Sequence, residues 1–98
     1  MADFTLSKED REHMLKLAVD HYTESRLDKA EKVVRGLLAI DPGEARGWQL
    51  LGSILALQGY RTAAEQVYRK AVDLDANDLN SLAALAEIAL DAMRLQDA

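Results

Sequence analysis

Apolar residues recur at helical spacing along most of the chain, most regularly between Gly47 and Ala76. One stripe has the i, i+3, i+4, i+7 spacing of a single helix face and consists of Trp48, Leu51, Gly52 and Leu55. Gly59 then interrupts the pattern, and a second stripe contains Ala64, Val67, Tyr68, Ala71, Val72 and Leu74. The stretch predicts two antiparallel helices. Because this pair cannot bury both stripes by itself, other elements must pack on either side of it.

Further helices are predicted on both sides of this pair. The first spans about residues 8–23; Ser7 and Asp10 at its start resemble a capping box, and residues 1–6 form a short lead. The second spans about residues 27–40 and is stopped by Asp41-Pro42-Gly43. Another helix begins near Leu79, and a new one is expected near Leu95. Because helix-forming residues are abundant and Pro occurs once, the chain predicts an all-α fold.

The predicted helices repeat with an offset of 34 residues. This offset relates Met14 to Trp48 and Leu82, and in the same way the sets Leu17, Leu51, Leu85 and Ala18, Gly52, Ala86. Such periodicity is typical of a solenoid in which each helical hairpin packs on its neighbours. We therefore predict one domain over residues 1–98 with about two and a half repeats, at about 11–44, 45–78 and, incomplete, 79–98.

Composition and charge disfavour several kinds of partner and site. A net charge of −5 without a basic patch disfavours nucleic acid and anionic membrane surfaces as partners. The longest uncharged run, from Gly47 to Tyr60, is too short to span a bilayer, and the N-terminus lacks the pattern of an export signal. The chain has no Cys, which excludes disulfides and thiolate zinc sites and permits a reducing compartment. We expect a cytoplasmic protein.

The sequence contains no pattern that indicates catalysis, a metal or a cofactor. His13 and His21 lie eight residues apart on one predicted helix and diverge too far around it to share a metal ion. Glu65 and Arg69 stand in the i, i+4 order that stabilises a solvated helix face. There is no phosphate-binding glycine loop and no Ser-His-Asp arrangement. We expect a non-enzymatic protein, and an enzyme with an unrecognised site is the least favoured alternative.

The middle unit resembles a tetratricopeptide repeat, a helical hairpin of 34 residues with characteristic Trp, Leu, Gly, Ala and aromatic positions. The matching residues are Trp48, Leu51, Gly52, Ala64, Tyr68 and Ala71. Leu55 replaces an aromatic residue of the pattern, and Ala76 stands where Pro is usual. The first unit keeps Leu17, Ala30 and Pro42, so the resemblance is strongest in the middle of the chain.

The same resemblance implies where a ligand would bind, because the first helix of each pair lines the concave face in tetratricopeptide arrays. The implied peptide-binding groove consists of Leu15, Val19, Tyr22, Gln49, Ser53, Ala56, Leu57, Ala83 and Leu90. Repeats that clamp the C-terminal carboxylates of heat-shock chaperones present Lys, Arg and Asn at such positions, whereas Leu15, Val19 and Ala83 stand here. A mostly apolar groove suits an extended peptide with hydrophobic anchors, or an amphipathic helix.

Residues 17–98 also resemble the small tetratricopeptide chaperones of bacterial type III secretion that hold translocator subunits. Beyond the generic repeat positions, this resemblance rests on Ala45-Arg46 and Ala86-Glu87. Those chaperones carry an extra N-terminal dimerising helix and complete their third repeat, and we expect neither feature in this sequence. Needle-subunit chaperones of the same systems, which work with a small helical co-chaperone, are a close variant.

The leading hypothesis is a secretion-type chaperone that holds a protein or peptide partner, such as a secretion-system subunit or a co-chaperone, in its groove. The alternative is a self-associating adaptor without a chaperone role, in which Leu82, Leu85 and Ile88 pack on a second copy in a homodimer. In that alternative, the predicted groove residues Tyr22, Leu57 and Leu90 are core or self-association contacts.

Overall fold

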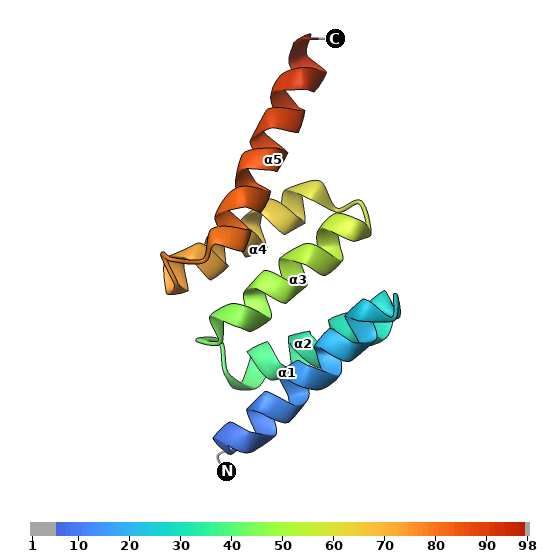
Figure 1. Cartoon of the computed structure of the whole chain (residues 1–98), viewed down its shortest axis with the longest axis vertical. Coiled ribbons are helices and arrows are strands. Elements are labelled where there is room, and N and C mark those ends of the chain that lie inside the picture. Colours follow the sequence, from blue (N-terminus) through green and yellow to red (C-terminus); the bar gives the residue numbers. More distant parts are fainter. Residues whose placement is uncertain (1–5, 98) are drawn as a thin grey trace.

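The computed structural model describes the backbone of residues 6–97 and the side chains of residues 6–95. This part of the chain forms five helices: α1 (Lys8–Thr23), α2 (Leu27–Ile40), α3 (Ala45–Leu57), α4 (Arg61–Leu74) and α5 (Leu79–Asp97). The molecule is elongated, with extents of 53 × 28 × 24 Å, and its two ends lie at opposite ends of the long axis (Figure 1). The predicted all-α fold of stacked helical hairpins is confirmed; most of the lead predicted over residues 1–6 lies outside the described residues.

Residues at the helix ends explain several of these boundaries. The Ser7 hydroxyl caps α1 by accepting a hydrogen bond from the Asp10 amide at 3.0 Å. Ser25, between α1 and α2, has a φ of 63°, and Gly59, between α3 and α4, has a φ of 89°. Glycine adopts this left-handed conformation at little cost because it has no Cβ. Gly59 therefore allows the sharp reversal that makes α3 and α4 a hairpin.

The prediction of a new helix near Leu95 is wrong. In the structure α5 continues without interruption from Leu79 to Asp97. The segment between Leu90 and Leu95 contains Asp, Ala, Met and Arg but neither Gly nor Pro, so nothing in it breaks the helix. Arg94 near its C-terminus also favours continuation, because a cation stabilises the negative end of the helix dipole.

The core lies between the first two hairpins. Val34, Leu37 and Ile54 are fully buried and Leu51 is 1% exposed, and these residues come from α2 and α3. Helices pack chiefly within the pairs α1–α2 and α3–α4 and next on the following pair, while α3 also touches α1 and α5. In Figure 1, α1, α3 and α5 follow one another along the long axis and α2 and α4 lie behind them. α5 contributes only partly buried apolar residues to the core, and its C-terminal half projects beyond the α3–α4 hairpin (Figure 1).

Candidate functional site

The predicted groove residues come from α1, α3 and α5, which follow one another on one side of the molecule (Figure 1), and we call this side the inner face. Several apolar side chains on this face are exposed to solvent. Val19 is 41% exposed, Leu57 is 63% exposed and Leu90 is 47% exposed. Ala56 and Ala83 are also exposed. These five side chains, spread over three helices, are available to contact a partner.

The other predicted groove residues are engaged within the protein. Leu15 is 8% exposed and belongs to the core, and Tyr22 is half-buried against that core. The Gln49 side chain donates a hydrogen bond to Asp78 at 2.6 Å. Ser53 shares a hydrogen bond with the Tyr68 hydroxyl at 3.1 Å. Leu15 and Tyr22 are therefore part of the packing of the protein. The hydrogen bonds of Gln49 and Ser53 leave these two side chains with fewer donors and acceptors for a ligand.

Arg46 joins the first two repeats at one edge of the inner face. Its guanidinium donates hydrogen bonds to Glu12 on α1, which lies 34 residues earlier, and to Glu44 at the start of α3. The pKa of Arg46 is raised by these bonds, first by the one to Glu44, and the pKa of Glu12 is lowered chiefly by its bond to Arg46. Residues one repeat apart are therefore spatial neighbours on this face, as the 34-residue offset requires.

Asp78 fixes the start of α5 against α3. Its carboxylate accepts hydrogen bonds from the Ser81 amide at 3.0 Å, from the Ser81 hydroxyl and from the Gln49 side chain. Burial raises the pKa of Asp78, but the bonds from Ser81 and Gln49 outweigh burial, so that this pKa lies below its usual value. Asp78 and Ser81 are both buried. The polar cluster therefore holds the third unit in its position.

Gly52 and Tyr68 determine how closely α3 and α4 pack. A Cβ atom on Gly52 would lie 2.7 Å from Cε1 of the Tyr68 ring, which is closer than packed carbon atoms approach. Tyr68 is 5% exposed, and its pKa is raised mainly by burial. Its hydroxyl reaches Ser53 on the inner face. The repeat signature residues Gly52 and Tyr68 thus have a packing role.

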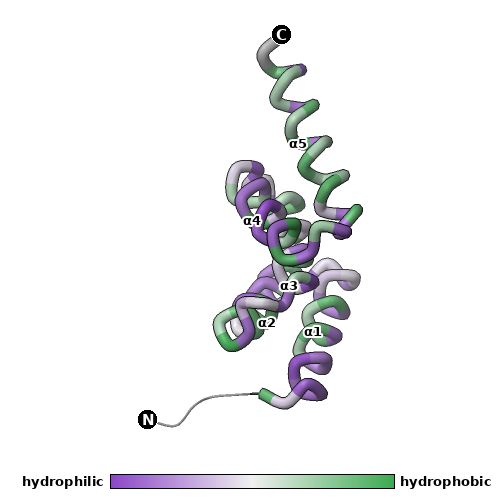
Figure 2. The backbone as a smooth tube through the Cα atoms, turned by 90° about the vertical axis from the view of Figure 1, so that its left-hand side faces the viewer, coloured by the Kyte–Doolittle hydropathy of each residue, from purple (hydrophilic) through white to green (hydrophobic). Residues whose placement is uncertain are grey.

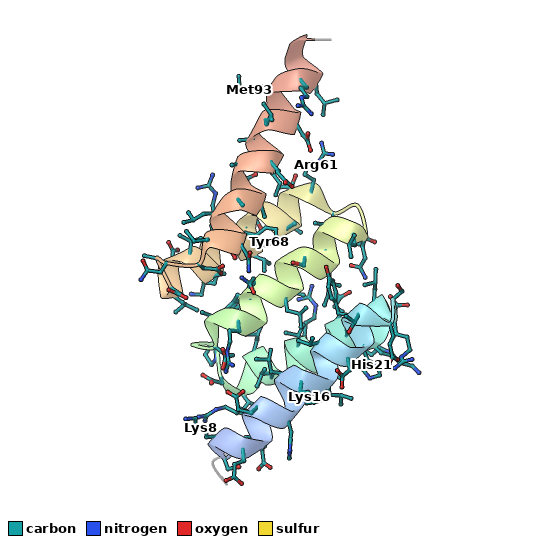
Figure 3. All side chains as sticks on the ribbon, in the orientation of Figure 1. Lys8, Lys16, His21, Arg61, Tyr68 and Met93 are labelled. Atoms are coloured by element: carbon teal, nitrogen blue, oxygen red, sulfur yellow. The ribbon has the colours of Figure 1, made fainter. Side chains whose placement is uncertain are left out.

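A cleft of about 440 Å³ opens between the α3–α4 turn and α5. It is lined by Ala56, Gly59, Arg61, Ala64, Glu87, Ile88 and Asp91. In Figure 3 Arg61 lies near α5, beside the turn. Arg61 and Ala64 were not among the predicted groove residues. The family pattern places the groove on the first helix of each repeat, and both residues belong to the second helix, α4. The lining combines apolar side chains with charged side chains of both signs.

The described residues show no group of three or more His, Cys, Asp or Glu side chains that could hold a metal ion. His21 accepts a hydrogen bond from Arg26 at 3.0 Å, which gives it a role near the end of α1. In the same part of the chain, every helix is too short or too polar to cross a bilayer.

The described helices form tetratricopeptide-like hairpins. Residues 45–78 match the family model described as the tetratricopeptide repeat, so the predicted resemblance is confirmed. These are also the bounds of the middle repeat that the 34-residue offset predicts.

Among solved structures, the chain is similar to type III secretion chaperones. It matches PcrH from Pseudomonas aeruginosa with 26% identity and a TM-score of 0.81, over 89% of this chain and 66% of that chain. PcrH in complex with the chaperone binding region of PopD matches with 26% identity and a TM-score of 0.84, over 93% and 68% of the two chains. The Yersinia enterocolitica translocator chaperone SycD matches with 23% identity and a TM-score of 0.82, over 92% and 68%. The chain thus spans about two thirds of the length of these structures. No match is found among the curated proteins.

Proposed function

We propose that this protein is a cytoplasmic, non-enzymatic chaperone of the type III secretion kind, which holds a segment of a translocator or needle subunit on its inner face. The observation that carries the proposal is the likeness to PcrH bound to the chaperone binding region of PopD, which extends over 93% of this chain. The exposed apolar residues of the inner face support it, because they offer anchor sites for an apolar segment without a clamp for a carboxylate terminus.

The expected affinity follows from the few anchor sites. Burying two or three apolar side chains contributes about 1.5–3 kcal/mol each, and the cost of ordering the segment offsets part of this gain. We therefore expect dissociation constants on the order of micromolar. A segment held at this strength exchanges readily, which suits a chaperone that must release its cargo.

The test is a titration of a fluorescent peptide with the PopD chaperone-binding sequence, followed by anisotropy. We expect Val19→Glu and Leu57→Glu to weaken binding at least about tenfold, because each places a charge at an anchor site. Leu17→Glu is the matched control: Leu17 is 47% exposed on the same helix as Val19, and an offset of two residues places it about 200° around the helix axis from Val19. Its affinity should equal that of the wild type.

Equal affinity for the wild type, Val19→Glu and Leu57→Glu would exclude binding at the inner face. If this peptide does not bind, selection from a random peptide library decides the question. Enrichment of sequences with apolar residues spaced to reach two of the three helices supports the proposal, and failure to enrich them contradicts it.

A further inference from the structure

The cleft between the α3–α4 turn and α5 differs from the corresponding place one repeat earlier, between the α1–α2 turn and α3. Its volume is about 440 Å³. It lies where α5 leaves the α3–α4 hairpin, and both Figure 1 and Figure 2 show the C-terminal half of α5 projecting beyond this hairpin. The 34-residue offset gives the counterpart of each lining residue at the first junction, so the two places can be compared position by position.

At the first junction, large side chains of the chain itself fill this place. Tyr22 corresponds to Ala56, and Leu27 corresponds to Arg61. Tyr22 and Leu27 are half-buried and pack against the core, whereas Ala56 and Arg61 are exposed. The cleft is therefore the space that an aromatic ring occupies one repeat earlier.

The apolar residues around this space are the same at both junctions. Ala30 and Ala64 are corresponding residues, and both are fully buried. Ile54 and Ile88 also correspond, but Ile54 is fully buried and Ile88 is only half-buried. The self-association alternative assigned Ile88 to a second copy, yet this side chain packs against the core of its own chain. An added ring in the cleft would cover the part of Ile88 that is still open to solvent.

The charged residues of the cleft favour a ring that carries a hydroxyl group. Glu87 and Asp91 are four residues apart, which places both carboxylates on one side of α5. A hydrogen bond from a phenol to a carboxylate is stronger than one between neutral groups. Asp91 already forms an ion pair with Arg94 at 3.7 Å, so Glu87 is the less engaged acceptor. Arg61 adds a guanidinium, which interacts favourably with the face of an aromatic ring.

The cleft lies on a different side of α5 from the surface on which a further helix could pack. On α3, the neighbouring helix α4 places its Tyr68 ring against Gly52, and Ala86 is the α5 residue that corresponds to Gly52. Ile88 and Asp91 lie about 160° and about 140° around the helix axis from Ala86. The site therefore does not depend on whether α5 is covered in the way that α4 covers α3.

We propose that this cleft receives a tyrosine side chain of the segment held on the inner face, in the way that Tyr22 fills the first junction. The ring lies on Ala56 and Ile88, beside the Arg61 guanidinium. Its hydroxyl donates a hydrogen bond to the Glu87 carboxylate. Because Ala56 belongs both to the inner face and to the cleft, a segment on that face can reach the cleft. The inference rests on the proposed function and adds a residue preference to it, one aromatic anchor among the aliphatic ones.

The first experiment uses p-cresol, which is the side chain of tyrosine as a free molecule, and follows amide chemical shifts by NMR. We expect a dissociation constant on the order of millimolar, with the largest shift changes at Ala56, Ile88 and Asp91. Ala56→Tyr should abolish these changes, because the chain then supplies the ring itself. No shift changes at these residues, or the same changes in Ala56→Tyr as in the wild type, overturn the proposal.

Thermal unfolding of the same variant tests the match between the two junctions without any ligand. Ala56→Tyr should unfold at a temperature about 4–8 °C higher than Ala39→Tyr, because its ring buries apolar surface in the cleft. Ala39→Tyr is the matched control, since Ala39 is exposed on α2 and the change in helix propensity is the same. Equal unfolding temperatures of the two variants contradict the proposal.

The second experiment replaces each position of the PopD peptide in turn by Tyr and measures binding by anisotropy. One substituted peptide should bind at least about tenfold more tightly than the parent peptide, and Ala56→Tyr should remove this gain. Phe at the same position should bind the wild type at least about threefold more weakly than Tyr, because it lacks the hydroxyl. Glu87→Ala should bind the Tyr and Phe peptides equally.

The outcomes separate this inference from the proposed function. If the parent peptide binds but Tyr improves binding at no position, the inference is wrong and the proposed function stands. If no peptide binds while p-cresol occupies the cleft, the proposed function is wrong, and with it the inferred source of the tyrosine, whereas the preference of the cleft for a phenol ring stands.

Discussion

The middle repeat and α5 carry the same pattern of residues in different surroundings. On α3, Leu51 is 1% exposed and Leu55 is 5% exposed, because α2 and α4 cover the helix from both sides. The Trp48 indole donates a hydrogen bond to the Pro42 carbonyl at 2.8 Å. On α5 the corresponding Leu85 is half-buried and Leu82 is 40% exposed, because α4 covers one side only. The identity of a repeat residue therefore does not determine its burial; the neighbouring helices do.

The two junctions between repeats also differ in their polar contacts. Arg46 bonds to Glu12, and Gln58 bonds to Glu31 at 3.1 Å, so α3 is tied to both helices of the first hairpin. α5 is joined to α3 by the bond between Gln49 and Asp78. The third unit thus depends on fewer contacts, which makes it the part of the molecule most ready to rearrange when a partner binds.

The largest difference between the two regions should appear on removing corresponding leucines. Leu51→Ala creates a cavity in the core and should lower the free energy of unfolding by about 3–5 kcal/mol. Leu85→Ala should lower it by about 1–2 kcal/mol, because Leu85 is only half-buried. Urea unfolding at a concentration where the protein is monomeric measures both values. Equal losses would contradict the difference in burial.

Substitutions at the corresponding positions 52 and 86 should lower the stability of the fold for different reasons. Gly52→Ala should destabilise the fold by about 1–2 kcal/mol although Ala favours helices, since its Cβ would overlap the buried Tyr68 ring. Ala86→Gly should cost about 1 kcal/mol from helix propensity alone. Thermal unfolding provides the readout.

The first hairpin provides the control for Gly52 and Tyr68. At the positions 34 residues earlier it carries Ala18 and Val34, and both are fully buried. Adding Tyr68→Val to Gly52→Ala should therefore cost less than the sum of the two single changes. Stabilisation by Gly52→Ala alone would show that α3 and α4 are not held at the observed distance.

The smallest effect concerns the cap of α5. Asp78→Ala should cost about 1 kcal/mol at neutral pH, because it removes an N-cap and the bond to Gln49. The pKa of Asp78 is lowered in the folded state, so its stabilisation is present above the unfolded pKa of about 3.9 and is lost as the pH falls through the folded pKa. Unfolding measurements at pH 7 and pH 3 should show the gap between wild type and variant shrinking. Asp73→Ala, on the exposed side of α4, serves as the control, and a gap independent of pH would contradict the role of this carboxylate.

The fold could be predicted because it depends on local periodicity and on turn residues such as Gly59, which act over a few positions. The uninterrupted course of α5 was not predicted. The expectation of a new helix near Leu95 came from the repeat pattern, although the sequence contains no helix-breaking residue at that point. The candidate site residues could be assigned to helices from the sequence, but their contacts could not. Gln49 and Ser53 were expected to face a ligand, but they bond to Asp78 and Tyr68, which lie 29 and 15 residues away. Such contacts depend on how repeats stack, and residue spacing within one helix does not reveal them.

Binding of a peptide across α1, α3 and α5 can be mapped residue by residue from the amide chemical shifts recorded by NMR during titration with the PopD peptide. We predict that the largest shift changes occur around Val19, Ala56, Leu57, Ala83 and Leu90, with small changes on the exposed sides of α2 and α4. Changes concentrated on α2 and α4 would contradict binding at the inner face.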